Sequence, residues 1–323
     1  MRGKPSSKIF RFRKAKTHMR KVFFQTLKEE FQKDKNLFLL IGDLGVKFFG
    51  DFKNIDSKRA INVGVAESNM VGLAAGLAMA GKNVYCYSII PFLIMRTFEQ
   101  IRIDLCYNNL PVKLLGAGGG LVYGSEGMTH HAIEDMAIMR ALPNMTVVAP
   151  GDSKEAEALA KLSVGYPGPL YIRFGRDSDP VIHQKEIDFK IGKGIFVKEG
   201  KGICLLANST MLYTAKLVSD LLENKGFSPA LISLHTVKPL DEELIRDCVK
   251  NYQAIFTLEE HNILGGLGGA VAEVLAESKY GGVFKRIGIP NKYSFPDIGS
   301  PDYLREKLGL DPQSIAKIIL SYV

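Results

Sequence analysis

The chain has 323 residues, a length that suggests two domains, each large enough for a core of its own. Hydrophobic residues make up 46% of it and charged residues 24%, which is typical of a soluble globular protein. No apolar run reaches the roughly 18 residues needed to span a bilayer, and no secretory signal pattern is present, so we expect a cytoplasmic protein that contacts no membrane.

The first 18 residues carry most of the net charge of +8. A solvated basic tail is the simplest interpretation, and a docking arm for an acidic partner is the second. Nucleic-acid binding would need basic side chains interleaved with stacking aromatic residues on a folded face, and the sequence shows no such pattern. The seven basic residues of this tail, which contains no acid and leaves +1 for the rest of the chain (8 minus 7), are Arg2, Lys4, Lys8, Arg11, Arg13, Lys14 and Lys16.

Residues 19–178 alternate between helical and strand patterns and form the first predicted domain. Phe23, Leu27 and Phe31 lie four residues apart, which predicts a helix over 19–33. Strands alternating with helices imply an α/β domain in which helices cover both faces of a mostly parallel sheet. The remaining predicted strands are 37–41, 60–65, 84–87, 112–115, 146–148 and 170–173, and the helices are 67–80, 92–107, 133–140 and 153–163.

A polar segment containing Pro180 follows, and we interpret residues 179–193 as an interdomain linker. Residues 194–323 repeat the alternation, so they predict a second α/β domain of the same class. Its predicted strands are 203–207, 229–234, 254–258 and 283–287, and its helices are 209–224, 242–250, 268–277 and 314–322.

The four cysteines are scattered without a Cys-x-x-Cys pair, and most have apolar neighbours, so buried free thiols are expected. The six histidines are dispersed too, and no zinc-site spacing occurs. We therefore predict no metal site built by this chain alone.

Ligands of parallel α/β sheets bind beyond the carboxyl ends of the strands. Four features follow predicted strands: Asp43, Glu67, the loop after Leu115, and Arg176. Glu67 is the sharpest of them, because its neighbours are nearly all small or apolar. A desolvated carboxylate there would have a raised pKa and could hold or relay a proton. The alternative is an acid that only favours the dipole of the following helix.

The loop over residues 116–131 is rich in glycine, which permits tight turns and the close approach of a ligand but is equally common in awkward loops. A dinucleotide-binding Gly-x-Gly-x-x-Gly does not fit, since Leu121 occupies its last position, and no P-loop pattern occurs. His130 and His131 end the loop, and one of them could be a polar active-site group. Arg173 and Arg176 follow the next strand, where a guanidinium suits a phosphate or carboxylate, or forms a surface ion pair.

Taken in order, these segments resemble the transketolase superfamily from about Val22 to Glu277. Any one motif is common, but six in order at the family's spacing are specific. The motifs are Gly64-Val-Ala-Glu-Ser-Asn-Met with its Ala-rich helix, Phe92 through Phe98-Glu-Gln-Ile-Arg, Gly124-Ser-Glu-Gly-Met-Thr-His, Ile138-Met-Arg-Ala-Leu-Pro-Asn-Met, Pro169-Leu-Tyr-Ile-Arg-Phe-Gly-Arg, and Glu260-His-Asn-Ile-Leu-Gly-Gly-Leu-Gly.

The family holds thiamine diphosphate between two domains, one of which binds the diphosphate through Mg²⁺ with a Gly-Asp-Gly motif while the other binds the aminopyrimidine. The resemblance implies that this chain has the pyrimidine-binding domain and the C-terminal domain, with Gly42-Asp-Leu-Gly near the start of the former. It therefore implies a split transketolase, in which an N-terminal partner subunit carries the Gly-Asp-Gly domain. Two copies of each subunit are expected, because the family's active sites lie at a dimer interface.

The resemblance also implies roles for matched residues. Glu67 would hydrogen-bond the pyrimidine N1′, so that the 4′-nitrogen can take the proton from thiazolium C2. Phe92 would stack on the pyrimidine ring, and Asp43 would belong to the cofactor side of the site. His130 would hydrogen-bond the donor's carbonyl or hydroxyl group, and Arg176 would hold a substrate phosphate.

Four positions depart from the family pattern. Glu126 stands where an Asp usually reads a substrate hydroxyl, and its extra methylene shifts its reach by about 1.5 Å. Gly118 replaces a substrate-binding His, and Lys47 stands near a phosphate-binding Ser. Ile89 replaces the first of two cofactor-side aromatic residues. We expect a kept cofactor site and an altered substrate pocket, with Lys47 meeting an anionic group and a donor or acceptor other than the usual pentose phosphates.

The resemblance leaves three alternatives to a transketolase subunit that transfers a two-carbon ketol unit between sugars or sugar phosphates. A 1-deoxyxylulose-5-phosphate synthase would carry its diphosphate domain in the same polypeptide. The β subunit of a 2-oxoacid dehydrogenase fits Ile133-Glu-Asp-Met-Ala-Ile-Met-Arg less well. A non-catalytic binding protein on the same fold is the third alternative, and a retained acid at Glu67 argues against it.

Overall fold

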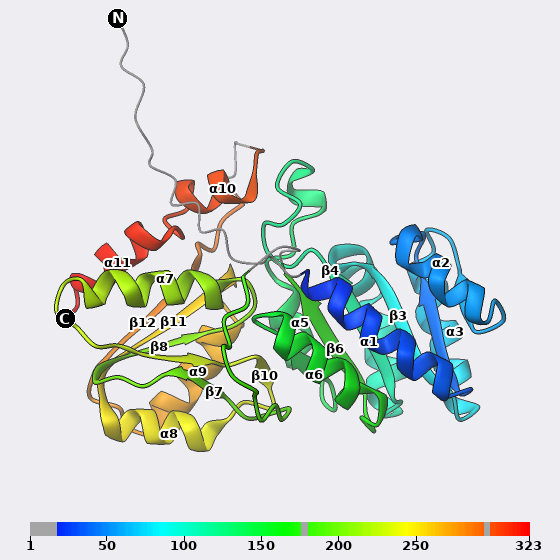
Figure 1. The fold of residues 1–323 in the computed structure, drawn as a ribbon, viewed down its shortest axis with the longest axis horizontal. Coiled ribbons are helices and arrows are strands. Elements are labelled where there is room, and N and C mark those ends of the chain that lie inside the picture. Colours follow the sequence, from blue (N-terminus) through cyan, green and yellow to red (C-terminus); the bar gives the residue numbers. More distant parts are fainter. Residues whose placement is uncertain (1–17, 176–179, 294–297) are drawn as a thin grey trace, which may run out of the picture.

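The computed structural model describes residues 18–175, 180–293 and 298–323. These residues form two α/β units that lie side by side, with the first unit spanning blue to green and the second green to red in Figure 1. Each unit is a mostly parallel sheet with helices on both faces, which confirms the predicted fold class.

The first sheet has seven strands in the order β10-β5-β6-β4-β3-β1-β2, and all neighbours are parallel except β10 against β5. Its apolar strands are buried on both faces, as expected of a parallel sheet between helical layers. The strands are β1 (Leu37–Ile41), β2 (Ala60–Asn62), β3 (Asn83–Ile89), β4 (Val112–Ala117), β5 (Thr146–Val148), β6 (Leu170–Phe174) and β10 (Thr236–Lys238).

Two apolar layers cover this sheet. On one face, α1 buries Phe23, Leu27 and Phe31, the three residues whose spacing predicted it, and packs beside α6. On the other face lie α3, α5 and the helical segment that follows β3. The helices are α1 (Met19–Lys33), α2 (Val46–Ile55), α3 (Glu67–Met79), η1 (Pro91–Met95), α4 (Phe98–Gln100), η2 (Ile101–Tyr107), η3 (Gly127–Thr129), α5 (Asp135–Ala141) and α6 (Ser153–Val164).

The second sheet has five strands in the order β12-β11-β8-β9-β7, parallel except for β7. Helices α7, α10 and α11 cover one face, and α8 and α9 cover the other. The elements are β7 (Ile195–Lys198), β8 (Gly202–Ala207), α7 (Met211–Glu223), β9 (Ala230–Ser233), α8 (Glu242–Asn251), β11 (Tyr252–Asn262), α9 (Leu267–Glu277), β12 (Val283–Ile289), α10 (Pro301–Lys307) and α11 (Pro312–Leu320).

The helix predicted over 92–107 is present, but it is divided into three short helical elements. The segment is helical, but two stretches of it, η1 and η2, have π-helical hydrogen bonding, which often marks functional sites. Five of the described elements were absent from the prediction, namely α2, η3, β7, β10 and α10. β10 is also unexpected in its place, because it follows β9 of the second unit and pairs with the first sheet.

Candidate active site

Glu67 is the first residue of α3, which begins a few residues after β2 ends at Asn62, and its side chain is only 1% exposed. Ser88 Oγ donates to one carboxylate oxygen at 3.0 Å, and Arg96 Nη1 donates to the other at 2.9 Å. Ser88 lies in β3 and Arg96 follows η1, so three separate elements meet at this carboxylate. Both oxygens therefore have a donor, and the carboxylate is held in one orientation.

Aromatic rings continue from this carboxylate toward the glycine-rich loop. The Arg96 guanidinium lies 4.8 Å from the Phe92 ring centroid, and Phe92 meets the His130 ring edge to face at 5.1 Å. His130 lies 6.0 Å from the Tyr123 ring, and its Nδ1 is 2.9 Å from the Thr129 hydroxyl. The structure thus brings three predicted residues, Glu67, Phe92 and His130, to one region.

The two neighbouring loop histidines have different surroundings. His130 is half-buried beside Phe92, whereas His131 is buried, and burial lowers the pKa of His131. His130 is thus the member of the pair that contacts the Phe92 ring near the entrance to the Glu67 region.

Asp43 and Ile89 lie at the ends of two adjacent strands, β1 and β3. Asp43 has a left-handed backbone conformation, and its carboxylate accepts a hydrogen bond from the Asn62 amide at 2.9 Å. Ile89 is half-buried and follows Ser88, which contacts Glu67. Both residues therefore lie at the same sheet edge as Glu67, as expected for carboxyl ends of parallel strands.

Of the predicted substrate residues, the structure describes the side chains of His130 and Glu126. The carboxylate of Glu126 is exposed and accepts from its neighbour Ser125 at 2.6 Å. Lys47 lies in α2, but its side chain is outside what the structure describes, and Arg176 falls outside the described residues altogether.

A cavity of about 810 Å³ lies between α1 and α2 and reaches Tyr123 of the glycine-rich loop. Its aromatic walls include Phe24, Phe48 and Tyr87, and Arg20 Nη1 donates to the Tyr87 hydroxyl at 2.9 Å. The other cations that line the cavity are Lys21 and Lys28.

The sequence analysis did not single out Ser88, Arg96, Arg20 or Tyr123. Ser88 could have been found, because it is a small polar residue at the end of the buried stretch of β3, next to the residues that follow the strand. Arg96 and Arg20 carried no local signal, since a cation on a helix is usually a solvated side chain.

The glycine-rich loop owes its composition to contacts within the chain. A Cβ at Gly119 would come within 2.7 Å of the Arg173 guanidinium, and one at Gly120, whose φ is +71°, within 2.5 Å of the Glu260 carboxylate. Arg173 is fully buried, and its Nε donates to Asp135 at 2.8 Å. Of the two functions considered for Arg173, a ligand site and a surface ion pair, neither applies, because its ion pair is internal.

Among residues 18–175, 180–293 and 298–323, no group of three or more His, Cys, Asp and Glu side chains could hold a metal ion. In the same part of the chain, no helix combines the length and the apolarity that a transmembrane segment requires.

Two family models match the chain. The transketolase pyrimidine binding domain matches residues 15–180, and the transketolase C-terminal domain matches residues 192–315. A putative transketolase C-terminal section of Methanocaldococcus jannaschii is 38% identical over 94% of this chain and 95% of its own length. One subunit of an apulose-4-phosphate transketolase of Phocaeicola vulgatus is 34% identical over 94% of this chain and 97% of its own.

A solved structure described as a split gene transketolase, inactive beta4 tetramer, superposes with a TM-score of 0.85. It is 33% identical in sequence and covers 95% of this chain and 98% of its own. Both halves of the fold, and nearly the full length of these relatives, are therefore matched. The chain belongs to the transketolase family, as a transferase subunit made of the pyrimidine-binding and C-terminal domains.

Proposed function

We propose that this chain is the C-terminal subunit of a two-subunit, thiamine-diphosphate-dependent transketolase that transfers a two-carbon ketol unit between sugar or sugar-phosphate substrates. The observation that carries the proposal is Glu67, a buried carboxylate at a strand-to-helix corner with both oxygens held by Ser88 and Arg96. A carboxylate on such rigid structure suits the recognition of one ring nitrogen.

The residues around Glu67 fit the pyrimidine half of the cofactor. Glu67 would hydrogen-bond the pyrimidine N1′ and share a proton with it, and the neighbouring Ser88 and Arg96 keep its carboxylate in place. Phe92 presents a half-buried ring for stacking, with Asp43 and Ile89 completing the cofactor side. When bound, thiamine diphosphate supplies a carbon centre that stabilises negative charge during ketol transfer.

The substrate side extends from His130 toward the cavity beside α1 and α2. His130 donates to or accepts from the oxygen atoms of the donor sugar, because it is half-buried and lies beside Phe92. The cations of the cavity, including Arg20, suit an anionic group, and we assign Lys47 and Arg176 to the same task. Glu126 reads a sugar hydroxyl.

The assembly includes an N-terminal subunit whose Gly-Asp-Gly domain binds the diphosphate and Mg²⁺, with two copies of each subunit. Relatives named as a transketolase C-terminal section and as a split gene transketolase support this division. Helix α3 supports it too, because its outer face beside Glu67 is exposed yet carries Gly72, Leu73, Gly76 and Met79. An apolar, small-residue helix face permits close packing of another subunit. We assign the complex to the cytoplasm.

Replacement of Glu67 by Gln tests the proposal in the reconstituted two-subunit enzyme. We expect ketol transfer to fall about 100-fold or more, the usual range for losing a proton-transfer group, while the subunits still associate on size-exclusion chromatography. Glu99→Gln is the matched control, since this exposed acid lies three residues beyond Arg96. Full activity of Glu67→Gln would contradict the proposal.

The reaction type and substrate are tested with paired donors. Two-carbon transfer from a ketose, without decarboxylation of pyruvate, is the expected result. Pyruvate decarboxylation would instead favour a synthase or a 2-oxoacid dehydrogenase subunit. We also expect poor activity with xylulose 5-phosphate and ribose 5-phosphate, because Glu126, Lys47 and Gly118 alter the substrate pocket; ordinary efficiency with that pair would refute the altered pocket.

A further inference from the structure

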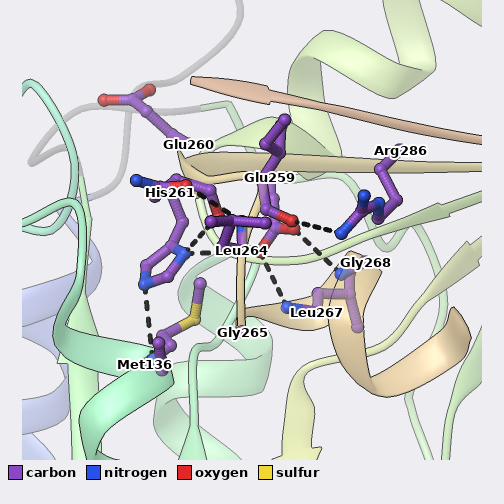
Figure 2. Close-up of polar contacts among 12 residues, drawn as sticks. Met136, Glu259, Glu260, His261, Leu264, Gly265, Leu267, Gly268 and Arg286 are labelled. Carbon is purple, nitrogen blue, oxygen red and sulfur yellow. Dashed lines mark hydrogen bonds and ion pairs between the residues drawn. The ribbon is translucent and has the colours of Figure 1, made fainter. Parts of the chain in front are cut away.

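Strand β11 places three consecutive polar residues, Glu259, Glu260 and His261, at the junction of the two units, and all three are buried (Figure 2). The Glu259 carboxylate accepts from the backbone N–H groups of Leu267 and Gly268, at the start of α9 in its own unit. His261 instead contacts the first unit, and Glu260 contacts both units.

His261 contacts the start of α5. Burial lowers the pKa of His261 to about 4, so its ring is neutral at pH 7. Its Nδ1 donates to the Asn262 carbonyl at 2.7 Å, which leaves Nε2 to accept from the Ala137 N–H at 3.4 Å.

Glu260 contacts the glycine-rich loop directly. Its carboxylate accepts from the Leu121 N–H at 2.7 Å and the Thr210 hydroxyl at 3.2 Å, and from Arg305 Nε of α10 at 2.6 Å. Glu260 is fully buried and Arg305 nearly so. A charged acceptor in such surroundings gives a stronger hydrogen bond than a neutral one.

Backbone hydrogen bonds close the loop at its base, so a contact that fixes Leu121 also restrains the rest of the loop. Gly120 and Ala132 exchange backbone hydrogen bonds at 2.7 and 3.0 Å across this base. Below it, Arg173 Nη2 donates to the Ala132 carbonyl at 3.0 Å and to the Glu260 carbonyl at 2.9 Å. Residues 121–131, which include Tyr123 and His130, therefore form a closed loop whose base is attached to β11.

The segment that carries Arg305 also packs on this loop. The Gly299 N–H donates to the Gly124 carbonyl at 3.2 Å, and a Cβ at Gly124 would collide with the Gly299 carbonyl and lie 3.0 Å from Leu304. The Leu121 side chain is buried in the apolar core of the second unit together with Leu304. Glu260 thus ties together the loop and the helix that covers it.

We propose that Glu260 and Arg305 of the C-terminal domain are positioning residues, which set the loop of residues 121–131 and thereby place His130 in the active site. The loop carries His130, so the proposal concerns the substrate side of the site, whereas Glu67 on the pyrimidine side is held by Ser88 and Arg96. The catalytic consequence rests on the proposed ketol transfer, whereas the structural consequence for the loop does not.

The structural arm uses hydrogen exchange of the full chain, followed by mass spectrometry. Arg305→Met and Glu260→Gln should speed exchange in peptides covering 121–131 about tenfold or more, the factor for losing one charge-assisted hydrogen bond. Peptides covering β1 and β3 should be unchanged. Lys307→Met is the matched control, because it removes the same charge from the exposed side of α10. Arg305→Lys should restore most of the protection.

The catalytic arm uses the reconstituted two-subunit enzyme. Arg305→Met should raise the KM for the donor sugar or lower kcat about tenfold, while the Kd for thiamine diphosphate stays within about twofold of wild type. Should Glu260→Gln fail to fold, Arg305→Met carries the test, since Arg305 keeps a small exposed fraction of 7% whereas Glu260 has none.

Two results would overturn the proposal. The first is unchanged exchange at 121–131 in Arg305→Met, or exchange that speeds equally throughout the chain, which is what a general loss of stability produces. The second is a substrate KM and kcat equal to wild type in an active enzyme. If the wild-type assembly transfers no ketol unit, the proposed function fails, and the exchange measurement still decides whether Glu260 and Arg305 hold the loop.

Discussion

Arg96 shows how much of the candidate site depends on single contacts between distant residues. It lies 29 residues beyond Glu67 in sequence, yet it provides one of the two donors to the buried carboxylate. Its own side chain is 48% exposed, so solvent weakens the ion pair, but Glu67 itself is removed from water. The Glu67 carboxylate is therefore held by two donors, one neutral and one positive.

Arg96→Ala should destabilise the isolated chain by about 1 kcal/mol, because the buried carboxylate loses its charged donor while the exposed half of the pair was already screened. Chemical denaturation measures the change. Arg102→Ala is the control, since it removes an exposed cation from the same helical segment and should change stability by less than about 0.5 kcal/mol. Equal effects of the two substitutions would show that the contact with Glu67 contributes nothing.

At the scale of elements, a glycine can be required for two reasons, namely a positive φ and a lack of space for a Cβ. Gly120 of the glycine-rich loop can be compared in both respects with Gly81, which follows α3. Gly120 and Gly81 both have positive φ values, +71° and +78°, which an alanine tolerates poorly. Only Gly120 also faces another group at short range, the Glu260 carboxylate, whereas a Cβ at Gly81 would meet nothing within 4 Å.

Gly120→Ala should therefore destabilise the chain well beyond Gly81→Ala. The left-handed backbone conformation costs an alanine about 1–2 kcal/mol of stability at each position. Only Gly120→Ala also displaces a buried carboxylate from its hydrogen bonds with Leu121 and Arg305, which lowers the stability further. Thermal or denaturant unfolding of the two variants side by side measures the difference. An equal loss of stability in the two variants would mean that the loop accommodates a Cβ at Gly120 without any further loss of unfolding free energy.

The segment after the first unit is held by a buried ion pair. His183 Nε2 lies 2.7 Å from the Glu155 carboxylate of α6, and the N–H groups of Ile182 and His183 donate to Asp152. Burial alone lowers the pKa of His183, but the hydrogen bond and charge of Glu155 outweigh it and raise that pKa above 6.5. Burial likewise raises the pKa of Glu155, and the contact with His183 lowers it overall, below 4.5.

This pair predicts a window of stability. The contribution of His183 is complete below its unfolded pKa of 6.5 and is lost as pH rises through the higher folded pKa. The contribution of Glu155 is present above 4.5 and is lost as pH falls through its lower folded pKa. The wild-type Tm should thus fall relative to His183→Gln as pH rises from about 6.5 to 9. If the Tm values of the two proteins changed in parallel with pH, the ion pair between His183 and Glu155 would not contribute to the pH dependence of stability.

At the scale of the whole molecule, α3 joins the candidate site to the surface. Its inner side is buried in the core of the first unit, through Met70, Val71 and Ala74. Its outer side exposes Leu73 and two glycines that could be approached closely, since a Cβ at Gly72 or Gly76 would meet nothing within 4 Å. A helix that is apolar all round is usually buried in the complete assembly.

Leu73→Glu should therefore prevent assembly with the partner subunit and leave single chains, because a buried unpaired carboxylate is costly at a subunit contact. Light scattering coupled to size-exclusion chromatography measures the mass. Leu162→Glu is the matched control, since Leu162 of α6 is similarly exposed, at 45% against 38% for Leu73. Assembly of Leu73→Glu at wild-type affinity would place the contact elsewhere.

Much of the fold could be predicted from local patterns. The period of Phe23, Leu27 and Phe31 determined α1, because helical geometry places residues four apart on one face. The short apolar strands between helices determined the parallel sheets. Glu67 could be singled out as well, since an acid in a small, apolar segment after a strand is unusual. These signals depend only on neighbours in the chain.

Only the tertiary structure decided which distant residues meet. It brought β10 to the first sheet, Arg96 to Glu67, and Glu260 to the amide of Leu121, 139 residues earlier in the chain. No local period encodes such contacts, because each depends on how two separately formed units pack and on which buried polar groups then need partners. The sequence by itself thus determined the elements, the family resemblance and the central acid, whereas packing decided what holds that acid and the loop beside it.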